Sequence, residues 1–177
     1  MTTTVKGIDF STLSLRDALD LAILVEEEAK ERYEELAEQL ELHRTHEAAK
    51  FFRFMVTNEA KHRAALAERR QVLYGAEPTT VTRGMIFDIE APDYDEARAF
   101  MSVREALHVA LRAEEKAHAF FVAALPHTTN NPAVHALFDS LCLEEVEHQY
   151  LVQLEIDKLP PDSGANPEDY GDEPVNQ

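Results

Sequence analysis

The chain has 177 residues, 45% of them apolar, which is enough for one folded domain with a sizeable core and argues against global disorder. Its net charge of −17, from 34 acidic and 17 basic residues, would repel nucleic acid and anionic membranes. Cys142 is the single cysteine, no apolar run approaches membrane-spanning length, and the N-terminal segment lacks the apolar core of a secretion signal. We therefore expect a cytoplasmic protein with no nucleic-acid or membrane partner.

Two long helices are predicted in the first half of the chain. The first begins at Ser14, which forms a capping-box pattern with the Asp three residues later, and ends near residue 41. The second runs from about residue 45 to 74, with an apolar face from Phe52 to Leu73, and stops at Gly75. The next segment, residues 76–101, is too long for a hairpin turn and is predicted to cross along a helix bundle.

Two further helices are predicted in the second half. The third begins near Ser102 and ends before Pro126. The fourth has Asn131 as its N-cap, Pro132 at its first position, and an end near Lys158. The order of two short connections around one long one predicts an all-α four-helix bundle of the ferritin-like type.

The two halves of the chain are copies of one another. Residues 14–33 align with residues 102–121 without a gap, and eight of the twenty positions are identical. The second helix of each half aligns at an offset of 86, which superposes two Glu-x-x-His steps. We interpret residues 1–159 as a duplicated helical hairpin that forms one domain, followed by an acidic, Pro-rich tail over residues 160–177 with the composition of a disordered segment.

Polar side chains interrupt the apolar faces of all four helices. Each half contributes a lone Glu from its first helix and a Glu-x-x-His pair from its second, and a pair spaced in this way lies on one face about 4.5 Å apart along the axis. Four buried carboxylates are costly unless cations compensate them, and two divalent ions would balance four charges. Carboxylate and imidazole ligands suit iron or manganese rather than structural zinc. The predicted metal ligands are Glu26, Glu59, His62, Glu114, Glu145 and His148.

These motifs resemble those of the rubrerythrin family within the ferritin-like di-iron proteins, over about residues 14–155. The resemblance rests on Glu26-x-x-Ala29-x-x-Arg32-Tyr33, Asn58-Glu59-x-x-His62, Glu114-x-x-Ala117-x-x-Phe120-Phe121 and Glu144-Glu145-x-x-His148. It implies a site for two iron ions, with manganese as an alternative, that reduces hydrogen peroxide or dioxygen while Fe(II) is oxidised. A peroxidase of this kind would act in oxidative stress.

Two departures from the family pattern shape the functional expectations. The chain has no pair of CxxC motifs, so it would need an external electron donor such as a rubredoxin-like protein. Leu111 stands where the family has an additional carboxylate that is implicated in its peroxidase chemistry. Glu115 and His118 form a Glu-x-x-His of their own and could substitute, but Glu115 lies about 100° from Glu114 and the pair is expected to face elsewhere.

Several alternatives remain open at this point. Tyr33 is a catalytic candidate whose hydroxyl either bonds to a ligand carboxylate or to another core neighbour, and its counterpart in the repeat is Phe121. The competing functions are a ferroxidase, an iron-binding and storage protein, a manganese catalase, and a metal-free helical module that binds a partner. The oligomeric state is also left open by the sequence, and a homodimer is one candidate.

Overall fold

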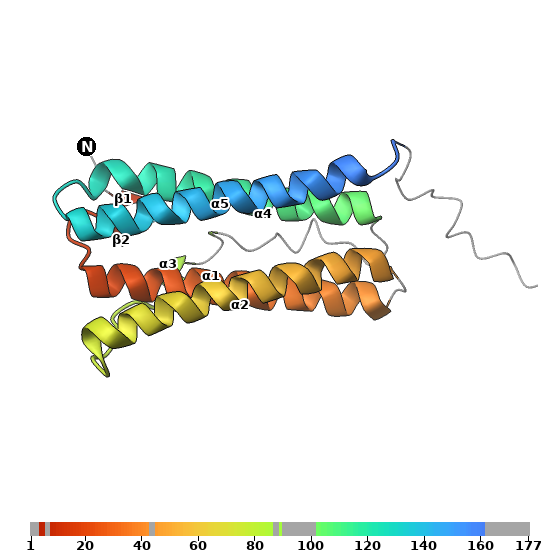
Figure 1. Cartoon of the computed structure of the whole chain (residues 1–177). Helices are drawn as coiled ribbons and strands as arrows, with labels where there is room; N and C mark the ends of the chain where they lie inside the picture. The colour runs from red at the N-terminus through yellow and green to blue at the C-terminus, as the bar shows by residue number, and fades with distance from the viewer. Residues whose placement is uncertain (1–3, 6–7, 43–44, 87–88, 90–101, 162–177) are drawn as a thin grey trace, which may run out of the picture.

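The structure, a computed structural model, describes residues 4–5, 8–42, 45–86, 89 and 102–161. Four long helices account for most of it (Figure 1). Their bounds are Leu15–Leu42 for α1, His46–Tyr74 for α2, Val103–Ala124 for α4 and Pro132–Lys158 for α5. All four lie where the sequence predicts them, within two residues at each end.

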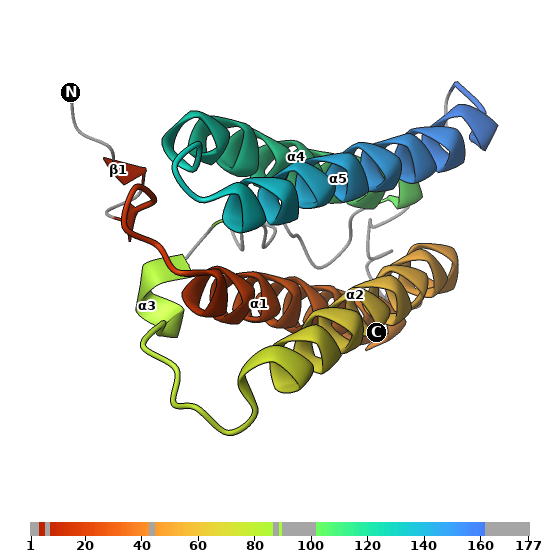
Figure 2. The same cartoon turned by 60° about the vertical axis from the view of Figure 1, so that its left-hand side comes forward.

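The four helices pair as two antiparallel hairpins, one of α1 with α2 and one of α4 with α5. Figure 2 shows the hairpins packed along each other, and across their interface α1 contacts α5 and α2 contacts α4. This confirms the all-α bundle with a duplicated hairpin. Much of the predicted crossover and nearly all of the predicted tail, namely residues 87–88, 90–101 and 162–177, lie outside the described residues.

Short elements close one end of the bundle. A two-stranded antiparallel pair, β1 (Thr4–Val5) and β2 (Ile8–Asp9), precedes α1, and it leads into Phe10. The Phe10 ring is buried and makes edge-on contacts with Phe120 and Phe138, with ring centroids 5.7 and 5.5 Å apart. The other short elements are α3 (Arg83–Ile86) and a 3-10 turn, η1 (Leu125–His127).

Local capping chemistry sets where the helices begin. Ser102 forms a complete capping box with Glu105, and the Asn131 side chain accepts a hydrogen bond from the Val134 amide. At the start of α1, the Ser14 hydroxyl accepts a hydrogen bond from the Asp17 amide at 3.1 Å, as its sequence pattern predicts. These caps fix the start of three helices, and so fix the register in which their inward-facing side chains meet.

The end of α2 is held by a backbone conformation and by one arginine. Gly75 has φ +56°, a left-handed conformation that ends helices at little cost for glycine. Arg70 donates to the carbonyl oxygens of Gly75 and Glu77, each at 2.6 Å, and pairs with Asp20 of α1 at 2.8 Å. One side chain thus ties the end of α2 to the start of the following segment and to α1.

The apolar core divides into two clusters along the bundle. One contains Phe10, Val25, Leu66 and Phe138, and the other contains Phe52 together with core residues of all four long helices. The acidic and imidazole side chains of the predicted site lie between them on every helix. Cys142 is buried in the first cluster.

One expectation for the core is wrong. Leu73 was expected on the apolar face of α2, but 51% of its surface is exposed. Leu73 lines an open pocket with Leu15 and Val72. In the same turns of α2 it is Arg70 that pairs with α1 and Tyr74 that packs against the first apolar cluster. Amphipathic periodicity gives the angle of a side chain about the helix axis and says nothing about whether a neighbouring helix reaches that far.

Replacing Arg70 tests the tie at the end of α2. We expect Arg70→Ala to lower the thermal midpoint by a few degrees, because it leaves Asp20 and two carbonyl oxygens without their donor. Arg69→Ala is the matched control, since Arg69 is an exposed neighbour that makes no ion pair with any described residue. Equal midpoints for the two variants would show that the tie contributes nothing.

Candidate metal centre

Seven acidic or imidazole side chains converge midway along the bundle. All six residues predicted from the sequence are among them, and each of the four long helices contributes at least one. The four predicted glutamates and one histidine are buried. The described part of the chain forms three groups in which one ligand atom per residue lies within 4.8 Å of the others: Glu114, Glu145 and His148; Glu59, His62 and His148; and Glu26, His62 and Glu144.

The first group is enclosed by α4 and α5. His148 Nδ1 lies 3.1 Å from Glu114 Oε2, and Glu145 completes the group from the same helix as His148. The other oxygen of Glu114, Oε1, accepts a short hydrogen bond from the Tyr33 hydroxyl. Of the two alternatives for Tyr33, the structure therefore has the bond to the Glu114 carboxylate. The Tyr33 ring is buried and stacks on Phe52 at 5.7 Å.

The second group joins the two hairpins. Glu59 is fully buried, and its Oε1 lies 3.7 Å from His148 Nδ1. The rings of His62 and His148 lie parallel, with centroids 4.9 Å apart and planes inclined by 8°. Glu59 and the two histidines thus connect α2 to α5 at the centre of the site.

The third group faces outward and contains a residue that the sequence analysis missed. His62 Nδ1 lies 4.0 Å from Glu26 Oε2 and 3.9 Å from Glu144 Oε2. Glu26 is buried, but the side chains of His62 and Glu144 are 30% and 39% exposed. A signal for Glu144 existed in the repeat, because its counterpart at the offset of 86 is Asn58 and the two halves differ there.

Burial and crowding shift the protonation of several of these groups in the metal-free site. Burial raises the pKa of Glu26 to about 7, with nearby Glu144 and Glu114 adding to the shift. Burial also raises the pKa of Glu144, and burial together with the neighbouring His148 lowers that of His62. For His148 burial acts to lower the pKa, but the hydrogen bond and charge of Glu114 outweigh it and the net shift is upward.

These donors have the chemistry and spacing of a cation site. Ligand atoms that bind one divalent ion at about 2.0–2.2 Å lie no more than about 4.4 Å apart, and the imidazole–carboxylate distances of 3.1–4.0 Å satisfy this. Among the residues that the structure describes, Glu26 Oε2 and His62 Nδ1 are buried with no hydrogen-bond partner. Buried polar atoms of this kind call for a partner, and a cation would be one.

The candidate substitutes for the missing carboxylate lie apart from these groups. Glu115 is exposed and His118 is half-buried, and neither belongs to any of the three groups formed by described residues. Leu111 packs at the edge of the second apolar cluster.

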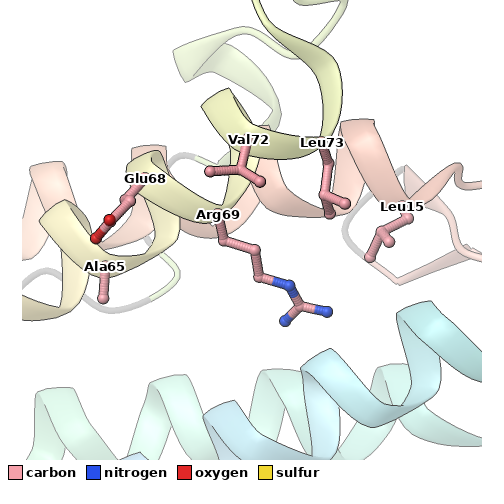
Figure 3. Close-up of a pocket in the computed structure, with 6 residues that line it drawn as sticks. All are labelled: Leu15, Ala65, Glu68, Arg69, Val72 and Leu73. Atoms are coloured by element: carbon pink, nitrogen blue, oxygen red, sulfur yellow. The ribbon is translucent and has the colours of Figure 1, made fainter.

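An open pocket of about 570 Å³ lies along the last turns of α2. It is lined by Leu15, Ala65, Glu68, Arg69, Val72 and Leu73. Figure 3 shows Arg69 extending from α2 toward the opposite hairpin. Ala65 and Arg69 follow His62 at intervals of three and seven residues, so the pocket continues the face of α2 that carries His62.

Comparison with known proteins agrees with this arrangement. The family model described as Rubrerythrin matches residues 17–156, which include the four long helices, except for two residues at the start of α1 and two at the end of α5, and every residue of the site. The chain belongs to the rubrerythrin family. Membership indicates a di-iron carboxylate protein, and the carboxylate and histidine groups could hold the metal.

The structure also resembles a solved member of this fold. An uncharacterized conserved protein from Magnetospirillum magnetotacticum MS-1 aligns with a TM-score of 0.68 and 26% identity, over 86% of this rubrerythrin-family chain and 100% of the other. The search of curated proteins returned no match. Within the described residues, no helix is both long enough and apolar enough to cross a membrane.

The bond from Tyr33 to Glu114 is testable by removing one oxygen atom. We expect Tyr33→Phe to lower the free energy of unfolding by about 1–3 kcal/mol, because a buried carboxylate oxygen loses its donor while the ring packing is kept. Urea unfolding of the metal-free protein measures this. Tyr150→Phe, at an exposed tyrosine, is the control and should change stability by less than about 0.5 kcal/mol.

The raised pKa of Glu26 predicts the pH dependence of the metal-free protein. An acid whose pKa is raised by folding holds its proton more tightly in the native state, so stability is gained as pH falls from about 7 toward 4.5. We expect unfolding experiments to show a gain of about 1–3 kcal/mol that is absent in Glu26→Gln. Glu115→Gln, at an exposed position, should retain the wild-type dependence. A wild-type slope in Glu26→Gln would contradict the assignment.

Proposed function

We propose that this chain is a non-haem di-iron redox protein that reduces hydrogen peroxide, with dioxygen as the alternative oxidant. The observation that carries the proposal is a layer of four buried glutamates and two histidines between two apolar clusters. Stability alone does not account for such a layer, because buried carboxylates weaken a fold unless cations or protons neutralise them. Membership of the rubrerythrin family supports iron as the cation.

The proposed ligands are Glu26, Glu59, His62, Glu114, Glu145 and His148. Two bound iron ions would supply the electrons for reducing the oxidant, each ion passing from Fe(II) to Fe(III). The protein's own part is to position and neutralise the donors and to limit solvent. Glu59 groups with both histidines, and the Tyr33 hydroxyl orients Glu114 by donating to its second oxygen.

The apolar surroundings restrict access to the buried half of the site. Phe52 and Met55 are fully buried on α2, within two turns of Glu59, and Tyr33 stacks on Phe52. Water reaches the site instead where His62 and Glu144 are exposed. A small oxidant such as peroxide suits a site whose donors are mostly buried better than a bulky organic substrate does.

Electrons must come from another domain or protein. No CxxC pair occurs in the 177 residues, so this segment holds no rubredoxin-type iron site of its own. We propose a rubredoxin-like donor.

A ferroxidase with iron-storage function is the second candidate. Leu111, in place of the carboxylate associated with peroxidase chemistry, favours it. A manganese catalase would use the same ligands with the other metal.

Metal content tests the ligand set. We expect anaerobically purified protein loaded with Fe(II) to hold two ions per chain, and Glu59→Ala and Glu145→Ala each to hold fewer, because each removes a buried carboxylate from the layer. Glu115→Ala, at an exposed position, is the control and should keep both ions. Two ions in both site variants would refute the proposed set.

The choice of oxidant is tested by single-turnover kinetics. Reduction of one peroxide takes two electrons, so the di-ferrous protein should consume one peroxide per chain and then stop until a reductant is added. We expect stopped-flow mixing at matched concentrations to show a faster reaction with peroxide than with dioxygen. A faster dioxygen reaction would favour the ferroxidase, and inertness toward both oxidants would favour storage.

A further inference from the structure

The two ends of the candidate site differ in their exposure to solvent. The group of Glu114, Glu145 and His148 is buried throughout. In the group of Glu26, His62 and Glu144, Glu26 is buried but the other two side chains are partly exposed. A duplicated hairpin with six matched ligands would build two equivalent positions, so the difference has to come from residues that the repeat does not share.

Glu144 is such a residue. The repeat places Asn58 of α2 opposite it, so one hairpin carries a carboxylate where the other carries a neutral amide. Glu144 Oε2 lies 3.9 Å from His62 Nδ1, on the opposite hairpin, and within 4.8 Å of a ligand atom of Glu26. Glu26 Oε2, nine-tenths buried, and His62 Nδ1 both point into this group with no hydrogen-bond partner among the described residues.

We propose that Glu144 is a seventh metal ligand, specific to the outer position formed with Glu26 and His62, and that this outer ion is the exchangeable one of the pair. The inference rests on the proposed di-metal function and adds an order of binding to it. The inner ion would be held by buried donors and the outer ion by two donors that solvent already touches.

Exposure explains why the outer ion would exchange first. Removing an ion requires water to replace each ligand in turn, and a side chain that is 39% exposed can rotate into water without opening the bundle. The donors of the inner group lack this freedom, because at least 97% of each of their surfaces is covered. Ala65, which lines the open pocket, lies one turn beyond His62 on the same face of α2.

The outer position also has a charge balance that suits a labile ion. Glu26 and Glu144 supply two carboxylates, and His62 supplies a neutral nitrogen, so a divalent ion is neutralised without the central Glu59. With Gln at position 144 the geometry would be kept, but one negative charge and one strong oxygen donor would be lost.

Anaerobic titration of the full chain with Mn(II) or Fe(II), followed by calorimetry, tests the proposal. We expect two ions per wild-type chain, and in Glu144→Gln one ion bound as before and the other at least tenfold more weakly. Glu144→Asp, which keeps the carboxylate, should fall between the two. The control is Glu147→Gln, an exposed carboxylate on the same helix whose charge also acts on His62.

Electron paramagnetic resonance of the Mn(II)-loaded protein gives a second readout. At two equivalents of Mn(II) per chain, and a metal concentration that fills both positions of the wild type, Glu144→Gln should show the signal of a single ion where the wild type shows a spin-coupled pair. Unchanged affinities in Glu144→Gln, equal loss of both ions, or an equal loss in Glu147→Gln would overturn the proposal. A wild type that binds no metal would instead overturn the proposed function itself, so the two failures are distinguishable.

Discussion

The structure depends on how four buried carboxylates are neutralised at the centre of an apolar bundle. Glu26, Glu59, Glu114 and Glu145 lie between the two apolar clusters, and histidines are close to three of them: His62 to Glu26, and His148 to Glu59 and Glu114. Protons can neutralise part of this charge, as the raised pKa of Glu26 indicates. Divalent cations would neutralise all of it, and would also join helices that otherwise repel each other at this level.

Features that lie far from the carboxylate layer hold its side chains in position. Apolar packing on both sides holds the helices in register, and the caps at Ser102 and Asn131 fix that register at the helix starts. The Tyr33 hydroxyl and the stacked rings of His62 and His148 then link different helices across the layer. The polar contacts of the layer thus link different helices, and the two apolar clusters on either side of it hold those helices together.

The sequence predicts the fold and the six repeated site residues because duplication displays them twice. A Glu or His that recurs inside an apolar face at a fixed offset is difficult to explain by amphipathicity alone. Glu144 escaped prediction because it is adjacent to Glu145 and so turned by about 100°, which on a lone helix points away from the site. Only the position of α2 across the interface makes it a neighbour of His62. The hydroxyl partner of Tyr33 and the exposure of Leu73 depended in the same way on distances between helices, which periodicity does not contain.

Anomalous diffraction from crystals grown anaerobically with Mn(II) would show whether the carboxylate layer binds metal, because it locates the ions without reference to activity. We expect two anomalous peaks per chain within the layer, one among Glu114, Glu145 and His148 and one among Glu26, His62 and Glu144. A fully ordered layer with no peak, its carboxylates joined by protons or ion pairs alone, would contradict the proposed metal site.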